Sequence, residues 1–371
     1  MDTPHQLTFP SVRLGAESTG RLSLPDSQPT PSYLSMPRGV FMTDRLLVVA
    51  DTGNHRVMIW HGLPTQHGQA ADVVLGQPDF YSQRSAGCGV ENGFHTPGAV
   101  LVVDGALLVA DAWHHRILGW NRVPERSGQP PDFALGQTDL QSVQVNRGAS
   151  VSALSLYWPY GIAYIAGYFY IADTGNRRVL GWKGLPAPEQ PPDFILGQDS
   201  ATDGLENRGR GTNHDTFRWP YALAGNQDVL YVADSGNHRV LGWSPRPDQD
   251  RPADLVLGQK DFTLWQEFPY RPQGAAALRF PSAVAVENDT LAVADMSNNR
   301  ILLWHRLPKS GGFQAADAVL GQLNFDQNGE NRWDALKLDT LCWPYGVHLH
   351  EGRLAIADSG NNRVLIWQIG K

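Results

Sequence analysis

One short pattern recurs six times along the chain and constrains its fold more than any other feature. Each copy contains an Asp, an Arg five residues later and a Trp four residues after the Arg, as in VADTGNHRVMIW. The six copies are centred on Asp51, Asp111, Asp173, Asp234, Asp295 and Asp358. The interval between successive Asp residues is nearly constant along the whole chain. A period this regular indicates one body built from stacked units of one kind.

Each repeat carries signals for four β-strands. A Pro precedes every repeat Asp at one fixed distance, as Pro37 precedes Asp51, and a short apolar run such as GIAYIA follows it. The second strand is the run that ends in Ala-Asp, and the third extends from the Arg to the Trp. The fourth is a run such as ADVVLGQ (71–77), which occurs five times. Small residues after each Pro, such as Gly161, indicate a first strand crowded against its neighbours.

The four residues between the Asp and the Arg predict a tight hairpin. In the first repeat, Gly53 and Asn54 are residue types that adopt the positive φ that such a turn needs. The flanking Asp51 and Arg56 then lie opposite each other, a pair expected to contribute roughly 0.2–1 kcal/mol. We expect the Trp and the apolar residues before it to fill the space between neighbouring sheets.

The start of the chain supplies the strand that the last repeat lacks. The chain ends shortly after Trp367, so the sixth repeat has no fourth strand of its own. The segment PSVRLGA (10–16) has the same pattern, and its Gly precedes the next Pro by nearly the same distance as in the other repeats. The sequence therefore predicts an all-β, six-bladed β-propeller forming a single domain, 1–371. Residues 1–16 close the ring, which removes exposed strand edges, and 17–35 form an inter-blade loop.

The pattern (V/I)AD(T/S)GNxRV(L/I)xW, preceded by PxG(V/I), resembles the NHL-repeat family, and the resemblance covers essentially the whole chain. These repeats are longer than is usual for that family, because a long loop follows each LGQ strand. The resemblance implies a propeller that binds proteins or, in some animal proteins, RNA. Related six-bladed propellers include amidating lyases, lactonases and strictosidine-synthase-like enzymes, and the fold does not select among these functions.

Composition narrows the surroundings of the protein. The formal net charge of −7 argues against a general affinity for nucleic acid or anionic membranes. Two cysteines imply no disulfide framework. No apolar run approaches membrane-spanning length. The first residues lack a basic segment followed by an apolar run, so we expect no secretory signal there. We expect a monomeric, cytoplasmic protein without a cofactor.

The residue after each Pro is expected at the mouth of the central channel. These residues are Arg38, Gly98, Tyr160, Tyr221, Ser282 and Tyr345. In three repeats the Pro follows a Trp, namely Trp158, Trp219 and Trp343. These aromatic residues predict a pocket for a planar or apolar group, with Arg38 and the tyrosine hydroxyls as polar contacts. The alternative is that the Trp and Tyr side chains pack between the blades.

The long loops after the fourth strands share one face of the propeller with the hairpin turns, because strand direction alternates within a blade. Loops of this length are usually functional. Three of them carry an Asn-Arg pair, and Arg147, Arg208 and Arg332 predict an arc that receives a carboxylate or phosphate. The alternative is that each Arg pairs with a loop Glu or caps a turn. A fourth loop has Trp265 with nearby aromatic residues instead, which suggests an apolar contact surface.

Two hairpins depart from the Asp-Thr-Gly-Asn pattern. The second repeat places Trp113 at the turn, and the fifth has Met296 directly after its Asp. A Trp at a turn is a candidate ligand contact, and the alternative is that it folds onto the neighbouring loop.

Catalytic and metal chemistry have little support. The position before the repeat Arg is His55, His115 or His238 in three repeats and Arg or Asn in the others, so we interpret it as tolerant of many side chains. Equivalent positions on separate blades are too far apart to share one metal ion. His348 and His350 alternate along the last inner strand, but the sequence identifies no further ligand beside them. We assign no catalytic residue, metal or cofactor.

Three functions therefore remain open. The first is a binding propeller that holds a protein, peptide or small molecule on the long-loop face at the channel mouth. The second is a lyase or hydrolase-like enzyme whose polar groups are Arg38 and the mouth tyrosines. The third is RNA binding, which requires a continuous basic face and a steep dependence on salt.

Overall fold

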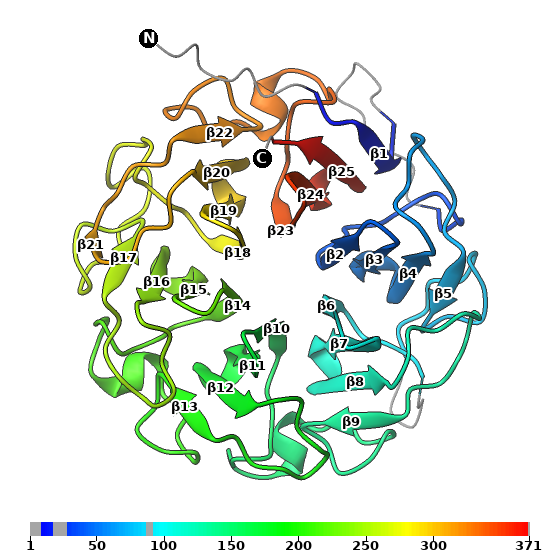
Figure 1. Cartoon of the computed structure of the whole chain (residues 1–371), viewed down its shortest axis with the longest axis horizontal. Coiled ribbons are helices and arrows are strands. Elements are labelled where there is room, and N and C mark those ends of the chain that lie inside the picture. Colours follow the sequence, from blue (N-terminus) through cyan, green and yellow to red (C-terminus); the bar gives the residue numbers. More distant parts are fainter. Residues whose placement is uncertain (1–8, 18–27, 87–91, 370–371) are drawn as a thin grey trace.

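Six antiparallel sheets stand in a ring around a central axis, and the inner strand of each lies nearest that axis (Figure 1). The structure is a computed structural model that describes residues 9–17, 28–86 and 92–369. The predicted six-bladed β-propeller is confirmed. Residues 1–8 of the predicted closing segment and 18–27 of the predicted inter-blade loop lie outside the described residues. In the described part of the chain, no helix is long and apolar enough to cross a membrane.

The first three blades each contain four strands, ordered from the axis outward as they occur in the chain. The first blade consists of β2 (Val40–Thr43), β3 (Leu46–Asp51), β4 (Arg56–Trp60) and β5 (Val73–Leu75). The second consists of β6 (Pro97–Val103), β7 (Ala106–Asp111), β8 (Arg116–Trp120) and β9 (Phe133–Leu135). The third consists of β10 (Pro159–Ile165), β11 (Tyr168–Asp173), β12 (Arg178–Lys183) and β13 (Phe194–Leu196).

The remaining blades include one unpredicted strand and the closing strand. The fourth blade consists of β14 (Pro220–Gly225), β15 (Leu230–Asp234), β16 (Arg239–Trp243) and β17 (Leu255–Leu257), to which the short β21 (Gly311–Gly312) adds in parallel. The fifth consists of β18 (Pro281–Glu287), β19 (Thr290–Asp295), β20 (Arg300–Trp304) and β22 (Ala318–Leu320). The sixth consists of β23 (Pro344–His350), β24 (Arg353–Asp358), β25 (Arg363–Gln368) and β1 (Val12–Gly15).

The N-terminal strand closes the ring, as the sequence predicts. β1 pairs antiparallel with β25, with Leu14 opposite Val364. Val12 and Leu14 are 5% and 1% exposed and belong to a core cluster that also contains Met42 of the first blade. The closing strand therefore joins the two ends of the chain by backbone pairing and by apolar contacts.

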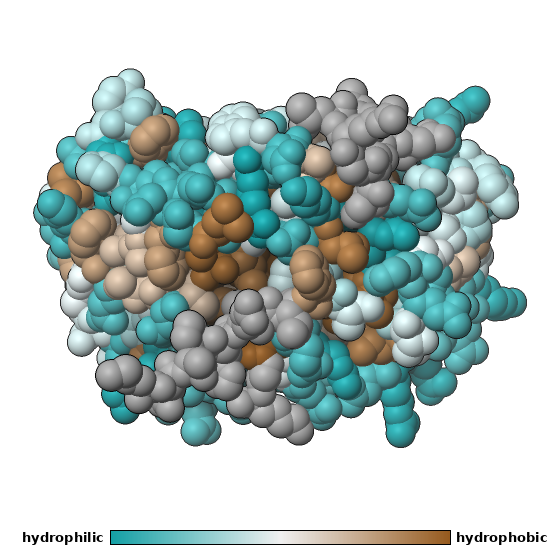
Figure 2. Space-filling model, turned by 90° about the horizontal axis from the view of Figure 1, so that it is seen from above, coloured by the Kyte–Doolittle hydropathy of each residue, from teal (hydrophilic) through white to brown (hydrophobic). Residues whose placement is uncertain are grey.

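The hydrophobic core lies between neighbouring blades. The repeat Trp residues take part in it, and Trp60 belongs to the cluster that joins the first blade to the last. Seen from the edge of the ring, hydrophobic side chains gather between two largely hydrophilic faces (Figure 2). The inner strands also approach closely, as predicted, because a Cβ atom at Gly161 would lie 2.3 Å from the carbonyl oxygen of Tyr221.

The hairpin turn has a different conformation from the one predicted. In the first blade, 52–54 form one turn of 3-10 helix, and the residue with positive φ is His55 (φ 52°) rather than Gly53 or Asn54. The Asn54 side chain instead donates to Asp51 Oδ2 at 2.8 Å. Gly53 is needed for space, since a Cβ there would lie 2.5 Å from Ser35 Oγ. The same conformation recurs in all six turns.

The predicted Asp–Arg pair is confirmed, but it is fully buried. Arg56 Nε donates to Asp51 Oδ2 at 2.6 Å, and both side chains have 0% exposure. The other carboxylate oxygen of Asp51 accepts from the backbone N–H of Ser35, and the guanidinium donates to carbonyl groups of the flanking loops, including that of Tyr33. The energy expected for a pair at a surface therefore does not apply, because removing one partner of a buried pair costs about 3–5 kcal/mol.

Removing residues 1–16 tests ring closure. The shortened chain leaves β25 as an open edge and exposes the apolar surface that β1 covers, so we expect the melting temperature to fall on the order of 10 °C. A chain that lacks only residues 1–8 keeps β1 and is the control. An unchanged melting temperature of the shorter chain in differential scanning calorimetry would refute the role of β1.

Candidate functional site

Four of the predicted site residues meet at the mouth of the central channel. The guanidinium carbon of Arg38 lies 4.4 Å from the ring centre of Tyr345 and 5.9 Å from that of Tyr160. The rings of Tyr160 and Tyr221 stack at 4.7 Å with 6° between their planes. Each of these residues follows the Pro that precedes the inner strand of its blade, and each blade has one such position. The four side chains therefore come from four different blades.

Gly98 provides the space for this arrangement. It lies between Arg38 and Tyr160 in the order of the blades, and a Cβ atom at Gly98 would lie 3.1 Å from the Tyr160 ring. A side chain at this position would therefore crowd the ring of Tyr160. The six equivalent positions after the prolines hold one Arg, one Gly, one Ser and three Tyr, so the mouth is asymmetric.

Trp113 joins the mouth from the hairpin turn of the second blade. Its indole N–H donates to the Tyr160 hydroxyl at 3.0 Å, and its ring lies 5.7 Å from that of Trp158. The side chain remains 45% exposed. It is therefore both packed on its neighbours and open to a ligand, which combines the two predicted alternatives.

The residues that precede the prolines surround the mouth. They are Met36, Thr96, Trp158, Trp219, Phe280 and Trp343. Trp219 and Trp343 are 36% and 43% exposed, so they are not wedged fully between blades. All except Trp219 have positive φ, between 45° and 59°. Bulky side chains rarely adopt this conformation, and a following Pro disfavours it further, so the surrounding structure must hold it in place.

The support comes from the preceding blade. His115 Nδ1 accepts a hydrogen bond from the backbone N–H of Trp158 at 3.2 Å, and Asn362 Oδ1 accepts from that of Met36 at 2.9 Å. Burial lowers the pKa of His115 to about 4, which keeps its ring neutral and its lone pair available at neutral pH.

The same acceptor position recurs around the ring, which corrects our interpretation of it as tolerant. His55, His238 and Asn299 accept from the backbone N–H groups of Thr96, Phe280 and Trp343. The Arg177 side chain contains no hydrogen-bond acceptor. The backbone N–H of Trp219 in the next blade donates to Asp234 instead. His and Asn side chains can both accept a hydrogen bond, and this common property was visible in the sequence. Our interpretation of the position did not use it.

The channel behind the mouth contains a cavity of about 300 Å³ lined by the inner strands of all six blades. Most lining side chains are aliphatic or small, and Arg38 and four tyrosines are among the polar ones. Burial raises the pKa of the Tyr160 and Tyr221 hydroxyls, so both are protonated hydrogen-bond donors at neutral pH. The mouth therefore combines aromatic surface, one guanidinium group and neutral hydroxyl groups.

The three loop arginines do not form an open anion site. Arg147 contacts Glu189 at 2.6 Å, and Arg332 contacts Asp339 at 2.8 Å. Arg208 contacts Asp250 at 2.7 Å and is also close to two further aspartates. The predicted pairing with a Glu describes Arg147, whereas Arg208 and Arg332 pair with Asp residues instead. The neighbouring asparagines are structural as well, because Asn146 and Asn176 exchange hydrogen bonds between their side-chain amides.

Trp265 lies apart from the mouth cluster. It is 57% exposed in the loop after β17, where Phe268 and Tyr270 are 38% and 84% exposed. Among the described residues, no ring contact joins Trp265 to the tyrosines or tryptophans of the mouth. Within that part of the chain, the structure therefore gives no contact that links Trp265 to Arg38 and the tyrosines.

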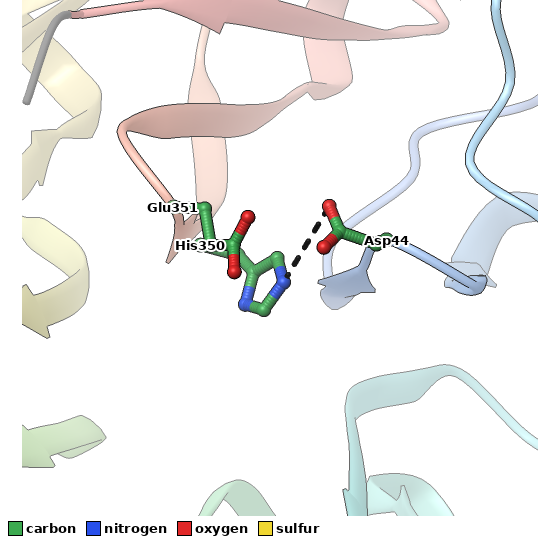
Figure 3. A group of neighbouring side chains, drawn as sticks. All are labelled: Asp44, His350 and Glu351. Atoms are coloured by element: carbon green, nitrogen blue, oxygen red, sulfur yellow. Dashed lines mark ion pairs between the residues drawn. The ribbon is translucent and has the colours of Figure 1, made fainter.

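A second polar group lies at the opposite end of the channel, where the inner strands end (Figure 3). Possible ligand atoms of Asp44, His350 and Glu351 lie within 4.8 Å of one another. Asp44 Oδ1 already contacts Arg353 at 2.6 Å, so a cation would compete with this guanidinium, and we assign no metal here. The sequence did not reveal these partners of His350, because Asp44 belongs to the first blade and His350 to the last.

Comparisons with known proteins do not identify the site. No protein-family model and no curated protein matches the chain. Similar solved structures include a structural-genomics protein of unknown function from Bacteroides thetaiotaomicron VPI-5482, with 13% identity and a TM-score of 0.48, over 98% of this chain and 75% of that one. Chaetomium thermophilum Raptor has 11% identity and a TM-score of 0.48, over 99% of this chain and 29% of that one. Neither structure contributes to the assignment of residues.

The substitution His115→Asn tests the hydrogen bond that supports the mouth. Folded His115 has a pKa of about 4 against an ordinary value of 6.5, so unfolding takes up a proton between these pH values. Its contribution to stability is complete above pH 6.5 and is lost as the pH falls toward 4. Asn serves as the acceptor in two other blades, so the variant should be nearly as stable as the wild type at pH 7.

Urea unfolding at pH 7 and pH 5 measures the effect. We expect the variant to lose less stability than the wild type over this interval, by up to about 1.4 kcal/mol per pH unit. The exposed His61→Asn is the matched control and should behave like the wild type. An equal loss in His115→Asn and the wild type would contradict a neutral His115 in the folded state.

Proposed function

We propose that the protein is a binding propeller whose ligand occupies the channel mouth on the long-loop face. The observation that carries this proposal is the meeting of Arg38, Tyr160, Tyr221 and Tyr345 in front of a cavity of about 300 Å³. Repeated residues build the scaffold, whereas these four occupy one repeat position at which the side chains differ. Ligand sites commonly combine apolar and aromatic walls with a few convergent polar groups, as this mouth does.

The tryptophans extend the proposed site beyond the channel. Trp113, Trp219 and Trp343 present exposed aromatic surface around the mouth, and Trp113 is connected to Tyr160 by a hydrogen bond. Such side chains offer a large contact area with little conformational freedom to lose on binding. A small molecule, or one end of a peptide or protein, fits this combination of a cavity and an aromatic rim.

Binding accounts for the cavity better than catalysis does. Ser and His residues act as nucleophiles or acid–base groups in many enzymes, and the cavity lining contains Ser282 and His348. Ser282 donates its hydroxyl hydrogen to the Pro344 carbonyl, and His348 Nδ1 accepts a hydrogen bond from the backbone N–H of Met42. Burial also lowers the pKa of His348 to about 4. Both groups thus have structural partners, and they give no support to the enzyme alternative.

RNA binding receives less support than a ligand at the mouth. It requires a continuous basic face, whereas the arginines of the long loops pair with acidic residues. The kinship with NHL-type propellers remains a proposal that rests on the repeated sequence pattern. The monomeric state and the cytoplasmic location likewise remain predictions.

Changing Tyr160, Tyr221 and Tyr345 together to Phe tests the proposed site. The rings remain, so folding should be nearly intact. The loss of three hydroxyl groups should weaken binding roughly 100-fold, at about 1 kcal/mol for each hydrogen bond lost. A panel of small carboxylic acids, sugars, nucleosides and short peptides is screened by the change in melting temperature, and affinities follow from titration calorimetry.

The exposed Tyr81→Phe is the control for this experiment. It lies in the loop after β5, and the substitution should leave every affinity unchanged. If every stabilising compound binds the triple variant and the wild type with equal affinity, the result contradicts a ligand site at the mouth.

A further inference from the structure

Among the described residues that line the channel cavity, Arg38 alone carries a formal charge at neutral pH, and that charge is positive. None of these residues is Asp, Glu or Lys, although the chain as a whole has a net charge of −7. His348 is neutral at physiological pH, because burial lowers its pKa to about 4. The hydroxyls of Tyr160 and Tyr221 are neutral as well, because burial raises their pKa. A ligand that enters this cavity therefore meets a single cation, the guanidinium group of Arg38.

Arg38 has no acidic partner among the described residues. The long-loop arginines Arg147, Arg208 and Arg332 form ion pairs. Arg38 instead contacts the faces of Tyr345 and Tyr160. Its Nε is buried and, within the described part of the chain, has no hydrogen-bond partner, while the side chain as a whole is half-buried. A guanidinium group with no counter-ion can form charge-assisted hydrogen bonds to an anion at the mouth.

The neighbouring hydroxyl groups are placed to assist. Within the described part of the chain, the hydroxyls of Tyr221 and Tyr345 have no protein hydrogen-bond partner, while that of Tyr160 accepts from Trp113. Each can donate its proton to an oxygen atom in the mouth. A guanidinium group flanked by O–H donors, with no carboxylate side chain among the described lining residues, matches a ligand group that only accepts hydrogen bonds.

We infer that the mouth binds a carboxylate group attached to an aromatic or apolar body, an inference that rests on the proposed binding function. The carboxylate would face Arg38 and the hydroxyls of Tyr221 and Tyr345, and the body would contact the exposed rings of Trp113 and Trp343. One cation with neutral donors matches a singly charged carboxylate better than a doubly charged phosphate. A cationic ligand would be repelled by Arg38.

This chemistry has two sources, a free small acid and the C-terminal carboxylate of a peptide chain. Titration calorimetry with the full chain distinguishes them by two matched pairs of probes. The first pair is 3-phenylpropionate and its neutral amide. The second is a tripeptide that ends in phenylalanine, with a free or an amidated C-terminus.

The wild type should bind at least one acid about 10-fold or more tightly than the matching amide, as expected for a charge-assisted hydrogen bond. The acid that binds more tightly identifies the source. In Arg38→Gln this preference should fall to within about 2-fold, while Arg38→Lys keeps part of it. The exposed Arg45→Gln is the control and should retain the full preference, and melting temperatures verify that each variant is folded.

Two results would overturn the inference. One is equal affinity of the wild type for acid and amide, or no binding of either acid at millimolar concentration. The other is an unchanged preference in Arg38→Gln. If acid and amide bind equally and both are weakened by the triple Tyr→Phe change, the mouth is a ligand site that does not select a carboxylate. If the stabilising compounds of the wider panel are all unaffected by that change, the proposed function fails as well.

Discussion

The buried Asp–Arg pair is the interaction on which the rest of each blade depends. It lies between the second and third strands, and its remaining hydrogen-bonding groups reach into both flanking loops. In the third blade, Asp173 Oδ1 accepts from the backbone N–H of Tyr157, and Arg178 donates to the carbonyl groups of Ser155 and Ala201. A buried pair of this kind adds little net stability over well-packed apolar side chains, but it fixes geometry once all its groups are satisfied. Here it fixes the chain just before the Pro that begins the inner strand.

This arrangement explains why function is expected at positions that do not repeat. The Asp–Arg pair, the Thr or Ser hydroxyl that donates to the next blade's Pro carbonyl in four blades, and the His or Asn acceptors all hold the same backbone path in blade after blade. The side chains that follow the prolines are delivered to the mouth by that path but are not needed to form it. They are free to differ, and they are where the ring loses its symmetry. Arg38 is the most pronounced departure, because it introduces a charge among neutral neighbours.

The sequence predicted the fold well and the site in part, for physical reasons that differ. The period of the repeats and the position of PSVRLGA determine the number of blades and the closing strand, since both are properties of spacing along the chain. The mouth residues were found because each follows a Pro at a fixed distance from an Asp. The αL residue of the hairpin was misplaced because Gly53 has the conformational freedom for it but is used for close packing. The ion pairs of Arg147, Arg208 and Arg332 and the acceptor role of His115 depend on residues distant in the sequence, and spacing alone did not reveal them.

A crystal structure of the protein soaked with 3-phenylpropionate would show whether the channel mouth holds an anion against Arg38. We expect carboxylate oxygen atoms within roughly 2.7–3.2 Å of the Arg38 guanidinium nitrogens, with the phenyl ring against the exposed tryptophans of the mouth. A probe that binds at another surface, or one in the mouth with its carboxylate turned away from Arg38, would contradict this expectation.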